Sequence, residues 1–253
     1  MSSHPSIHAS HEHDPRWDAV DHYAIPHLHG RNKALSEVLD KAWKAQTENG
    51  LPDIAVSPAQ GKFLMLQARM LGVKHALEVG TLGAYSTIWL AHANPDIKIT
   101  TVEVDAKHAA VAKDSLRAAG VADRVEIIVG SGVDVLPKLV EEVNKGQRER
   151  FGFAFIDADK ENNWTYFDQA AKMCTPRACL IVDNVVRKGR LADEEAAASD
   201  KNIRGAREVI EKVGKDERVD GAVIQTVGEK SYDGFLVAVA RDDIVEYVKS
   251  QAA

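Results

Sequence analysis

The stretch Phe151–Lys160, FGFAFIDADK, begins as a run of apolar residues and ends in two carboxylates and an ammonium group. The apolar part has the composition and length of a buried β-strand. Because an unpaired charge is costly to bury, the charged end either reaches solvent or forms a binding site. The residues of this charged end are Asp157, Asp159 and Lys160.

Similar apolar runs alternate with helical patterns from residue 75 onward. Near-continuous apolar strands separated by helices are typical of a parallel sheet covered on both faces. The sequence therefore predicts an α/β fold. Strands are expected near residues 75–80, 97–105, 124–130, 151–158 and 178–185, and the helices that follow them near 84–93, 107–119, 132–144, 163–173 and 203–213.

The two ends of the chain differ from this alternation. Strand-like runs at 219–227 and 233–241 are separated by only a short connection, which predicts an antiparallel pair. Toward the N-terminus, the spacing of apolar residues predicts helices near 31–49 and 58–71.

Residues 1–30 contain most of the ten histidines and have a polar composition. A segment of this kind is predicted to be a flexible tail. We therefore expect a His-rich tail over 1–30 and a single domain over 31–253, in which N-terminal helices cap an α/β core.

The composition limits the class of protein. A chain of 253 residues that is 45% hydrophobic can bury a sizeable core. A formal net charge of −6 argues against nucleic acid as the main partner. The two cysteines, Cys174 and Cys179, match no zinc or redox spacing and are predicted to be ordinary buried thiols. Neither a bilayer-spanning run, which takes roughly 18 residues, nor the apolar core of a signal peptide is present, so we expect a cytoplasmic protein without a membrane partner.

Ligands of open parallel sheets bind outside the carboxyl ends of the strands. The first predicted strand ends in LEVGTLGAYS, whose glycines admit a ligand to the backbone but lack the G-x-G-x-x-G spacing of a dinucleotide site. Glu103 ends the second strand about twenty residues beyond Gly80, a separation that suits a carboxylate bound to ribose hydroxyls. The alternative is an ordinary charged strand end. The third strand ends in VGSGVD, a turn with room for a planar base.

Polar side chains also follow the fourth and fifth strands. Asp157 and the pair Asp183 and Asn184 would meet at one edge if these strands are neighbours. Two carboxylates and an amide oxygen are hard ligands, which suit Mg²⁺, Ca²⁺ or Mn²⁺. The alternative is two unrelated polar strand ends.

With these residues in view, the chain resembles the cation-dependent class I O-methyltransferases, the group that contains catechol and caffeoyl-CoA O-methyltransferases. The resemblance extends over about residues 56–241. It implies a Rossmann-like seven-stranded sheet in the order 3-2-1-4-5-7-6 with the last strand antiparallel, S-adenosylmethionine as cofactor, and a homodimer. The segments that carry it are VSPAQGKFL, LEVGTLGAYSTIWLA, TVEVD, FIDADK, VDNV and DGFLVAVA.

The resemblance implies a set of residues that contact the cofactor. One position departs from the family pattern E-x-G-x-x-x-G-Y-S, because Ala84 occupies the second glycine. Gly83, just before it, is expected to supply the turn; if position 84 needs a positive φ, alanine costs about 1 kcal/mol there. The implied contacts are Val56, Glu78, Gly80 and Ser86 at the amino-acid end, Glu103 at the ribose, Gly132 near the adenine, and Asp157 and Asp159 facing the cofactor.

The resemblance further implies that Asp157, Asp183 and Asn184 bind the cation and that Lys160 is the general base. A phenol has a pKa of about 10 and is a poor nucleophile until it loses its proton. A cation bound to its oxygen lowers that pKa, and a lysine near a cation releases its own proton more readily. The expected function is a metal-dependent O-methyltransferase that acts on an aromatic with vicinal hydroxyls.

Two other functions stay open. An NAD-dependent oxidoreductase would share the glycine turn and the ribose carboxylate, but it would not need the three metal ligands. A non-catalytic S-adenosylmethionine-binding homologue would keep the fold without the base. The acceptor is also open: the loop 185–202 should border its pocket, where Arg187, Lys188 and Arg190 either meet an acidic substrate or are solvated.

Overall fold

The computed structural model describes residues 14–251. Its centre is a seven-stranded sheet in the order β3-β2-β1-β4-β5-β7-β6, which confirms the predicted order. β7 is antiparallel to both of its neighbours, and the other pairs are parallel. The strands are β1 (His75–Val79), β2 (Lys98–Glu103), β3 (Val125–Val129), β4 (Phe151–Ile156), β5 (Cys174–Val182), β6 (Val219–Gly228) and β7 (Ser231–Ala240).

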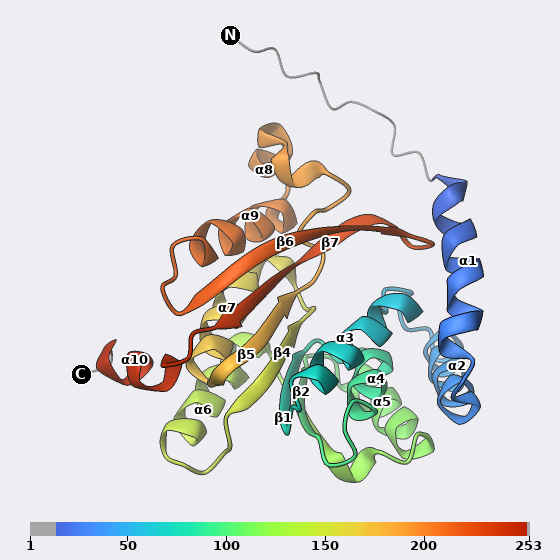
Figure 1. Cartoon of the computed structure of the whole chain (residues 1–253), viewed down its shortest axis with the longest axis horizontal. Coiled ribbons are helices and arrows are strands. Elements are labelled where there is room, and N and C mark those ends of the chain that lie inside the picture. Colours follow the sequence, from blue (N-terminus) through green and yellow to red (C-terminus); the bar gives the residue numbers. More distant parts are fainter. Residues whose placement is uncertain (1–13, 252–253) are drawn as a thin grey trace.

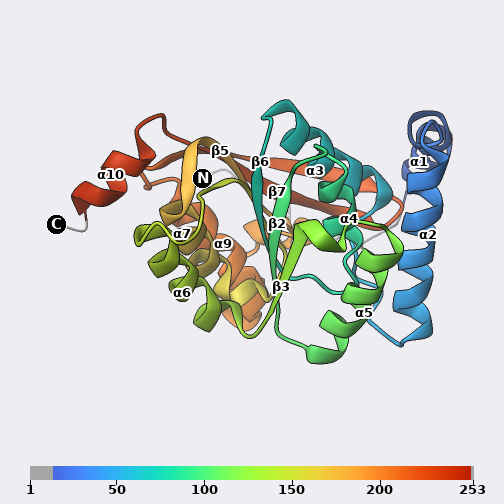
Figure 2. The same ribbon diagram turned by 90° about the horizontal axis from the view of Figure 1, so that it is seen from below.

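Helices cover both faces of the sheet, as Figure 1 and the view from below in Figure 2 show. Neighbouring residues of β4 point to opposite faces, so Phe155 belongs to one buried core and Ile156 to the other. This two-sided burial explains why the strand is apolar throughout. The first core lies under α2 (Lys33–Glu48), α3 (Pro58–Met70), α4 (Tyr85–Ala91) and α5 (Ala106–Ala118), and the second under α6 (Gly132–Asn144), α7 (Asn163–Lys172) and α9 (Lys201–Val213).

The register of the strands brings the charged strand ends together. Ile156 of β4 is paired with Val79 of β1 on one side and with Val182 of β5 on the other. The next residues, Gly80, Asp157 and Asp183, therefore leave the sheet at one level.

The N-terminal segment differs from the flexible tail predicted over residues 1–30. A helix, α1 (Pro15–His29), begins after the capping residue Asp14 with proline in its first turn. None of its side chains is buried, so it lacks the strong apolar stripe that predicts a helix. It stands at the edge of the molecule beside the β6–β7 turn (Figure 1), where Asp21 accepts a hydrogen bond of 2.9 Å from the backbone N–H of Glu229. Residues 1–13, with four of the histidines, lie outside the described residues.

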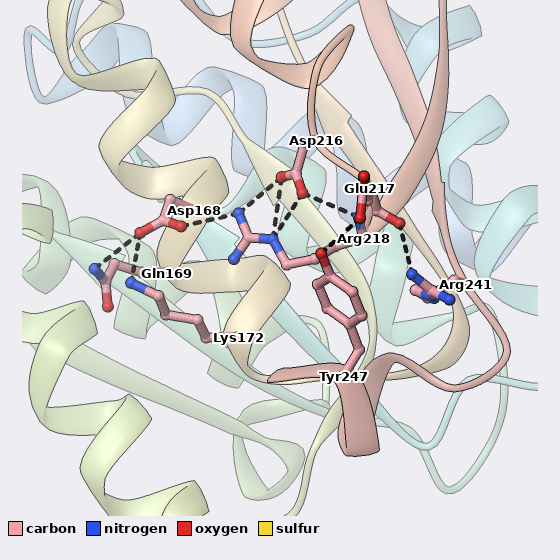
Figure 3. A network of polar contacts seen from close by, with 8 residues as sticks. All are labelled: Asp168, Gln169, Lys172, Asp216, Glu217, Arg218, Arg241 and Tyr247. Carbon is pink, nitrogen blue, oxygen red and sulfur yellow. Dashed lines mark hydrogen bonds and ion pairs between the residues drawn. The ribbon is translucent and has the colours of Figure 1, made fainter. Parts of the chain in front are cut away.

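Two helices in the C-terminal part were not predicted, α8 (Glu194–Ser199) and α10 (Ile244–Gln251). α10 lies beside a polar network centred on Arg218 (Figure 3), whose guanidinium is 2.9 Å from Asp168 of α7 and 2.7 Å from Asp216. Tyr247 of α10 donates to Glu217 at 2.9 Å. This network ties the start of β6 to α7 and α10.

Cys174 and Cys179 are free and buried, and burial raises the pKa of each thiol to about 12, as befits inert core thiols. Between residues 14 and 251, no helix combines the length and the apolar character that crossing a membrane requires.

Candidate functional site

A cavity of about 770 Å³ opens at the carboxyl ends of β1, β2, β3 and β4. Its wall is made by the segments that follow these strands. Seven of the eight residues expected to contact a cofactor line it: Val56, Gly80, Ser86, Glu103, Gly132, Asp157 and Asp159.

Two glycines shape this wall because no side chain fits at their positions. Gly80 has a φ of +98°, and a Cβ there would lie 2.3 Å from the carbonyl oxygen of Asp157. A Cβ on Gly132 would lie 2.6 Å from the ring of Tyr166. The ends of β1 and β4 can therefore approach closely, and the backbone itself forms the surface that a ligand would meet.

Glu78, the eighth expected residue, lies beneath the cavity. Its side chain is fully buried and accepts hydrogen bonds from the hydroxyls of Ser86, Thr87 and Thr101. Burial raises the pKa of Glu78 to about 7, although the three hydrogen bonds oppose this shift. Glu78 thus orients Ser86, which does line the cavity. Direct contact of its carboxylate with a cofactor stays a prediction.

Glu103 is held at the cavity wall by backbone donors. Its Oε2 accepts from the N–H of Thr81 at 3.1 Å and of Leu82 at 2.8 Å, and its Oε1 accepts from Asp105 at 3.0 Å. A carboxylate has about four acceptor positions, and these N–H groups take three. His108 Nδ1 lies 3.5 Å from Oε1, so a ligand would meet Oε1 beside His108. The N–H contacts fix the loop after β1 against the end of β2.

The loop after β1 corrects the expectation that Gly83 supplies its turn. Gly83 does not have a positive φ, whereas Ala84 has a φ of +68° and begins α4 in the left-handed conformation. Gly83 is needed for a different reason, since a Cβ there would lie 2.1 Å from Cγ of Gln46 in α2. Position 83 must therefore be glycine because α2 packs closely against it, whereas the left-handed turn is made by Ala84.

Asp159 is positioned by two side chains that the sequence did not single out. Its Oδ1 accepts from the hydroxyl of Tyr166 at 2.5 Å, and its Oδ2 accepts from the amide of Asn162. Burial and the charge of Asp159 raise the pKa of Tyr166, so this hydroxyl keeps its proton and donates. The sequence did contain a signal for this contact, because a tyrosine stands in the first turn of the helix that follows Asp159.

Asp157, Lys160 and Asp183 form a charged cluster where β4 and β5 end. Lys160 Nζ lies 2.6 Å from Asp157 Oδ1. Burial and then the charge of Asp157 raise the pKa of Asp183, and Lys160 opposes this effect. Asn184 follows with a φ of +55° and donates from Nδ2 to Asp233 at 3.4 Å.

The predicted ligand set is therefore assembled at one edge of the sheet. Among residues 14–251, no group of three or more His, Cys, Asp and Glu side chains is arranged to hold a metal. The predicted set contains only two carboxylates, from Asp157 and Asp183, and takes its third oxygen from the amide of Asn184.

A second cavity, of about 580 Å³, adjoins the first at this edge, and Val56, Asn184 and Arg187 line both. We call it the acceptor cavity, after the role that we propose for it. Apolar side chains form much of its wall, including the rings of Phe63 and Phe235, whose centroids are 5.1 Å apart. It is built from α1, the segment before and within α3, and the β6–β7 hairpin.

Comparison with known proteins identifies the family to which this arrangement belongs. Residues 30–237 match a family model described as O-methyltransferase. This chain belongs to the O-methyltransferase family. Its class of fold and its class of enzyme are therefore those that the sequence motifs predicted.

Individual relatives of this O-methyltransferase match it over most of their length. The O-methyltransferase imqG of Aspergillus flavus is 52% identical over 228 residues, 90% of this chain and 92% of that protein. A catechol O-methyltransferase of Mycobacterium tuberculosis is 42% identical over 88% of this chain and 95% of its own. Among solved structures, the fold matches the O-methyltransferase TomG of Streptomyces achromogenes in complex with SAM, with a TM-score of 0.81. The match covers 90% of this chain and 98% of TomG, and the two sequences are 39% identical.

Proposed function

We propose that this O-methyltransferase transfers the methyl group of S-adenosylmethionine to one hydroxyl of a catechol-like aromatic with the help of a divalent cation. The observation that carries the proposal is the position of the Asp157–Lys160–Asp183 cluster, at the edge where the two cavities adjoin. A methyl donor in the first cavity and a phenol in the acceptor cavity would meet there. The names of the relatives, TomG in complex with SAM and a catechol O-methyltransferase, support this choice of ligands.

The first cavity fits a cofactor that carries a nucleoside. Gly80 and Gly132 leave spaces that any side chain would fill, and Glu103 presents a carboxylate fixed by backbone donors. S-adenosylmethionine, when bound, supplies a methyl group on a positively charged sulfur. In this proposal Glu103 accepts hydrogen bonds from its ribose, and Gly132 and Asp159 face its adenosine part.

The donor set at the strand ends fits a hard cation. The pKa of Asp183 is raised in part by repulsion from Asp157, and a positive charge held by both carboxylates would remove that repulsion. Asp157, Asp183 and the amide oxygen of Asn184 would be its protein ligands, with Mg²⁺ the proposed ion and Ca²⁺ or Mn²⁺ chemically similar. When bound, the cation supplies the charge that lowers the pKa of a phenol.

Lys160 is the proposed proton acceptor. Only 8% of its surface is exposed, so its amine is held in the wall of the cavity at the level of the metal ligands. In its neutral form it takes the proton of the phenol hydroxyl that receives the methyl group. The apolar residues Val56 and Phe235 orient the ring and exclude water around this step.

Metal dependence can be tested on the purified full-length protein with S-adenosylmethionine and caffeate, following formation of S-adenosylhomocysteine. Activity should be lost in EDTA and return with Mg²⁺ or Mn²⁺. Asp183→Ala should have the same effect as EDTA while its circular dichroism stays that of the wild type. The matched control is Asp220→Ala, an exposed carboxylate of β6. Full activity of Asp183→Ala, or of the wild type in EDTA, would refute the metal assignment.

Binding separates this proposal from the other functions that the sequence left open. Calorimetry should detect S-adenosylmethionine and no NAD, and the opposite result would favour an oxidoreductase. Binding of S-adenosylmethionine without turnover of any catechol tested would favour a non-catalytic homologue.

We also propose that the enzyme forms a homodimer. Large apolar side chains of α1 and α3 are exposed, among them Tyr23 and Met70, which are each 71% exposed. Covering such side chains would favour association. Light scattering coupled to size exclusion should give twice the chain mass, and a monomer at micromolar concentration would contradict the proposal.

A further inference from the structure

The acceptor cavity has two cationic side chains in its described wall, Arg187 and Lys230. Lys230 is fully engaged. Its Nζ donates to the carbonyl oxygen of Ala55 at 2.6 Å, lies 3.3 Å from Asp53, and stands 4.4 Å from the centroid of the Trp43 ring. These contacts hold the ammonium group at the rim and neutralise it.

The acidic side chains of the same cavity are engaged as well. Asp21 accepts from the backbone of Glu229. Asp233 Oδ1 accepts from the backbone N–H of Arg187 and of Gly234, both at 2.9 Å. No carboxylate of the wall pairs with the guanidinium of Arg187, and within residues 14–251 that guanidinium has no hydrogen-bond or ion-pair partner. Its charge does act on Asp200, outside the wall, whose pKa is lowered mainly by backbone hydrogen bonds and in small part by the charges of Arg190 and Arg187.

The loop after Asn184 determines where this guanidinium lies. The N–H of Val185 donates to Gly234 at 3.0 Å, and Asp233 holds the N–H of Arg187, so the loop is tied to β7. Arg187 and Lys188 both have a positive φ, of 55° and 59°. Arg187 then lines both cavities, whereas Lys188 is exposed.

The third cation of the loop, Arg190, lies 3.4 Å from Asp200 and lines neither cavity. Of the three cations that the sequence placed near the acceptor, only Arg187 therefore faces the cavities. A guanidinium presents a planar fork of donors that binds a carboxylate through two hydrogen bonds. Next to it, Ile54, Phe63 and Phe235 provide apolar surface for an aromatic ring.

We propose that Arg187 binds a carboxylate of the acceptor, so that the enzyme prefers phenolic acids to neutral catechols. This inference rests on the proposed function and names the class of its substrate. The methionine part of the cofactor also carries a carboxylate, and Arg187 lines both cavities. The test must therefore separate an effect on the acceptor from an effect on the cofactor.

The test compares caffeate with methyl caffeate, two catechols that differ in the negative charge. We expect the wild type to have the higher kcat/KM with caffeate. Arg187→Ala should reduce kcat/KM for caffeate by about tenfold more than for methyl caffeate, because a hydrogen bond to a charged group contributes about 1.5–3 kcal/mol, which corresponds to about 10- to 100-fold. Arg187→Lys should keep part of the preference, and Arg190→Ala should keep all of it.

Three results would overturn the inference. They are a wild type that does not prefer caffeate, an Arg187→Ala variant that loses activity equally with both acceptors, and a variant in which only the KM for S-adenosylmethionine rises. Turnover of methyl caffeate by the wild type tests the proposed function separately. If neither catechol is methylated, the proposed function fails and this inference fails with it.

Discussion

Lys160 is held between Asp157 and the backbone of α9. On one side its Nζ lies 2.6 Å from Asp157 Oδ1, and both side chains are largely shielded from solvent. On the other side α9 approaches so closely that a Cβ on Gly205 would lie 2.0 Å from the carbonyl oxygen of Lys160. The backbone of Lys160 is therefore fixed by α9, and its amine is held by Asp157 before any substrate arrives, as a positioned base requires.

Replacing Lys160 by alanine should reduce turnover by about 10²- to 10⁴-fold, the usual loss when a general base is removed. Binding of S-adenosylmethionine, measured by calorimetry, should change little. Part of the turnover should return as pH rises, because the phenol then ionises without a base. The control is Lys172→Ala, which removes a similar ion pair, with Asp168, far from the cluster. A Lys160→Ala variant within about threefold of the wild type at neutral pH would sink the assignment.

Glu78 gives the protein a pH-dependent stability whose sign follows from its raised pKa. In the folded state Glu78 keeps its proton up to a pH of about 7, whereas an ordinary glutamate has a pKa of 4.5. The stabilisation from protonated Glu78 is therefore complete below pH 4.5 and is lost as the pH rises through about 7. Glu78→Gln does not titrate. The free energy of unfolding of Glu78→Gln should therefore rise relative to that of the wild type across this window, by an amount on the order of 3 kcal/mol.

Urea unfolding without cofactor, below, within and above the window, measures this difference. Glu126→Gln is a control of opposite sign, because a hydrogen bond from Arg148 lowers the pKa of Glu126. That variant should be less stable than the wild type near neutral pH, and its deficit should shrink in acid. A difference between Glu78→Gln and wild type that does not vary with pH would show that Glu78 titrates normally.

Ala84→Gly should leave stability nearly unchanged, although Ala84 is fully buried. Relief of the left-handed strain contributes about 1–2 kcal/mol. Loss of a buried methyl group, about 0.8 kcal/mol, and the greater freedom of glycine in the unfolded chain, about 0.4–1 kcal/mol, offset it. Ala68→Gly in α3, equally buried but helical, should lose about 2 kcal/mol. Equal losses at both positions, by urea unfolding, would mean that Ala84 is not strained.

Arg218→Ala should lower the free energy of unfolding by about 2 kcal/mol, because it leaves the buried carboxylate of Asp216 without its cation. Asp168 also loses the guanidinium but keeps its ion pair with Lys172. Methyl transfer at low temperature should persist, since no residue of the network lines either cavity. Arg177→Ala is the control: it removes an ion pair with Asp242 whose side chains are 78% and 80% exposed, and it should change stability by less than about 1 kcal/mol. Similar losses for the two variants would show that the network is not a buried anchor.

The sheet and its charged edge were predictable because their signals are local. Apolar runs such as Phe151–Ile156 identify strands that are buried on both faces, and a carboxylate directly after such a strand must leave the sheet at its carboxyl end. Asp157 and Asp183 could be placed together once their strands were taken as neighbours. Their register, with Ile156 opposite Val182, confirms it.

Other features depend on contacts between distant segments, which no local pattern records. Glu78 alternates with its neighbours as a strand residue should, but only the packing of α4 and β2 shows that three hydroxyls surround it. α1 buries no side chain, so its apolar residues have no periodic stripe. Arg187 and Arg190 are only three residues apart, but Arg187 lines the cavities and Arg190 does not. Asp233 binds the backbone N–H of Arg187, whereas Asp200 pairs with the side chain of Arg190.

The acceptor cavity and the first cavity draw on different parts of the chain. The hydrogen bond between Asp21 and Glu229 joins residues 208 positions apart, and the acceptor wall consists mainly of such terminal segments. The glycines and carboxylates of the first cavity come mostly from the middle, between Val79 and Tyr166. If the two cavities bind acceptor and methyl donor as proposed, mutations near either terminus can diversify the acceptors during evolution, or in a laboratory library, while the residues that bind the methyl donor stay unchanged.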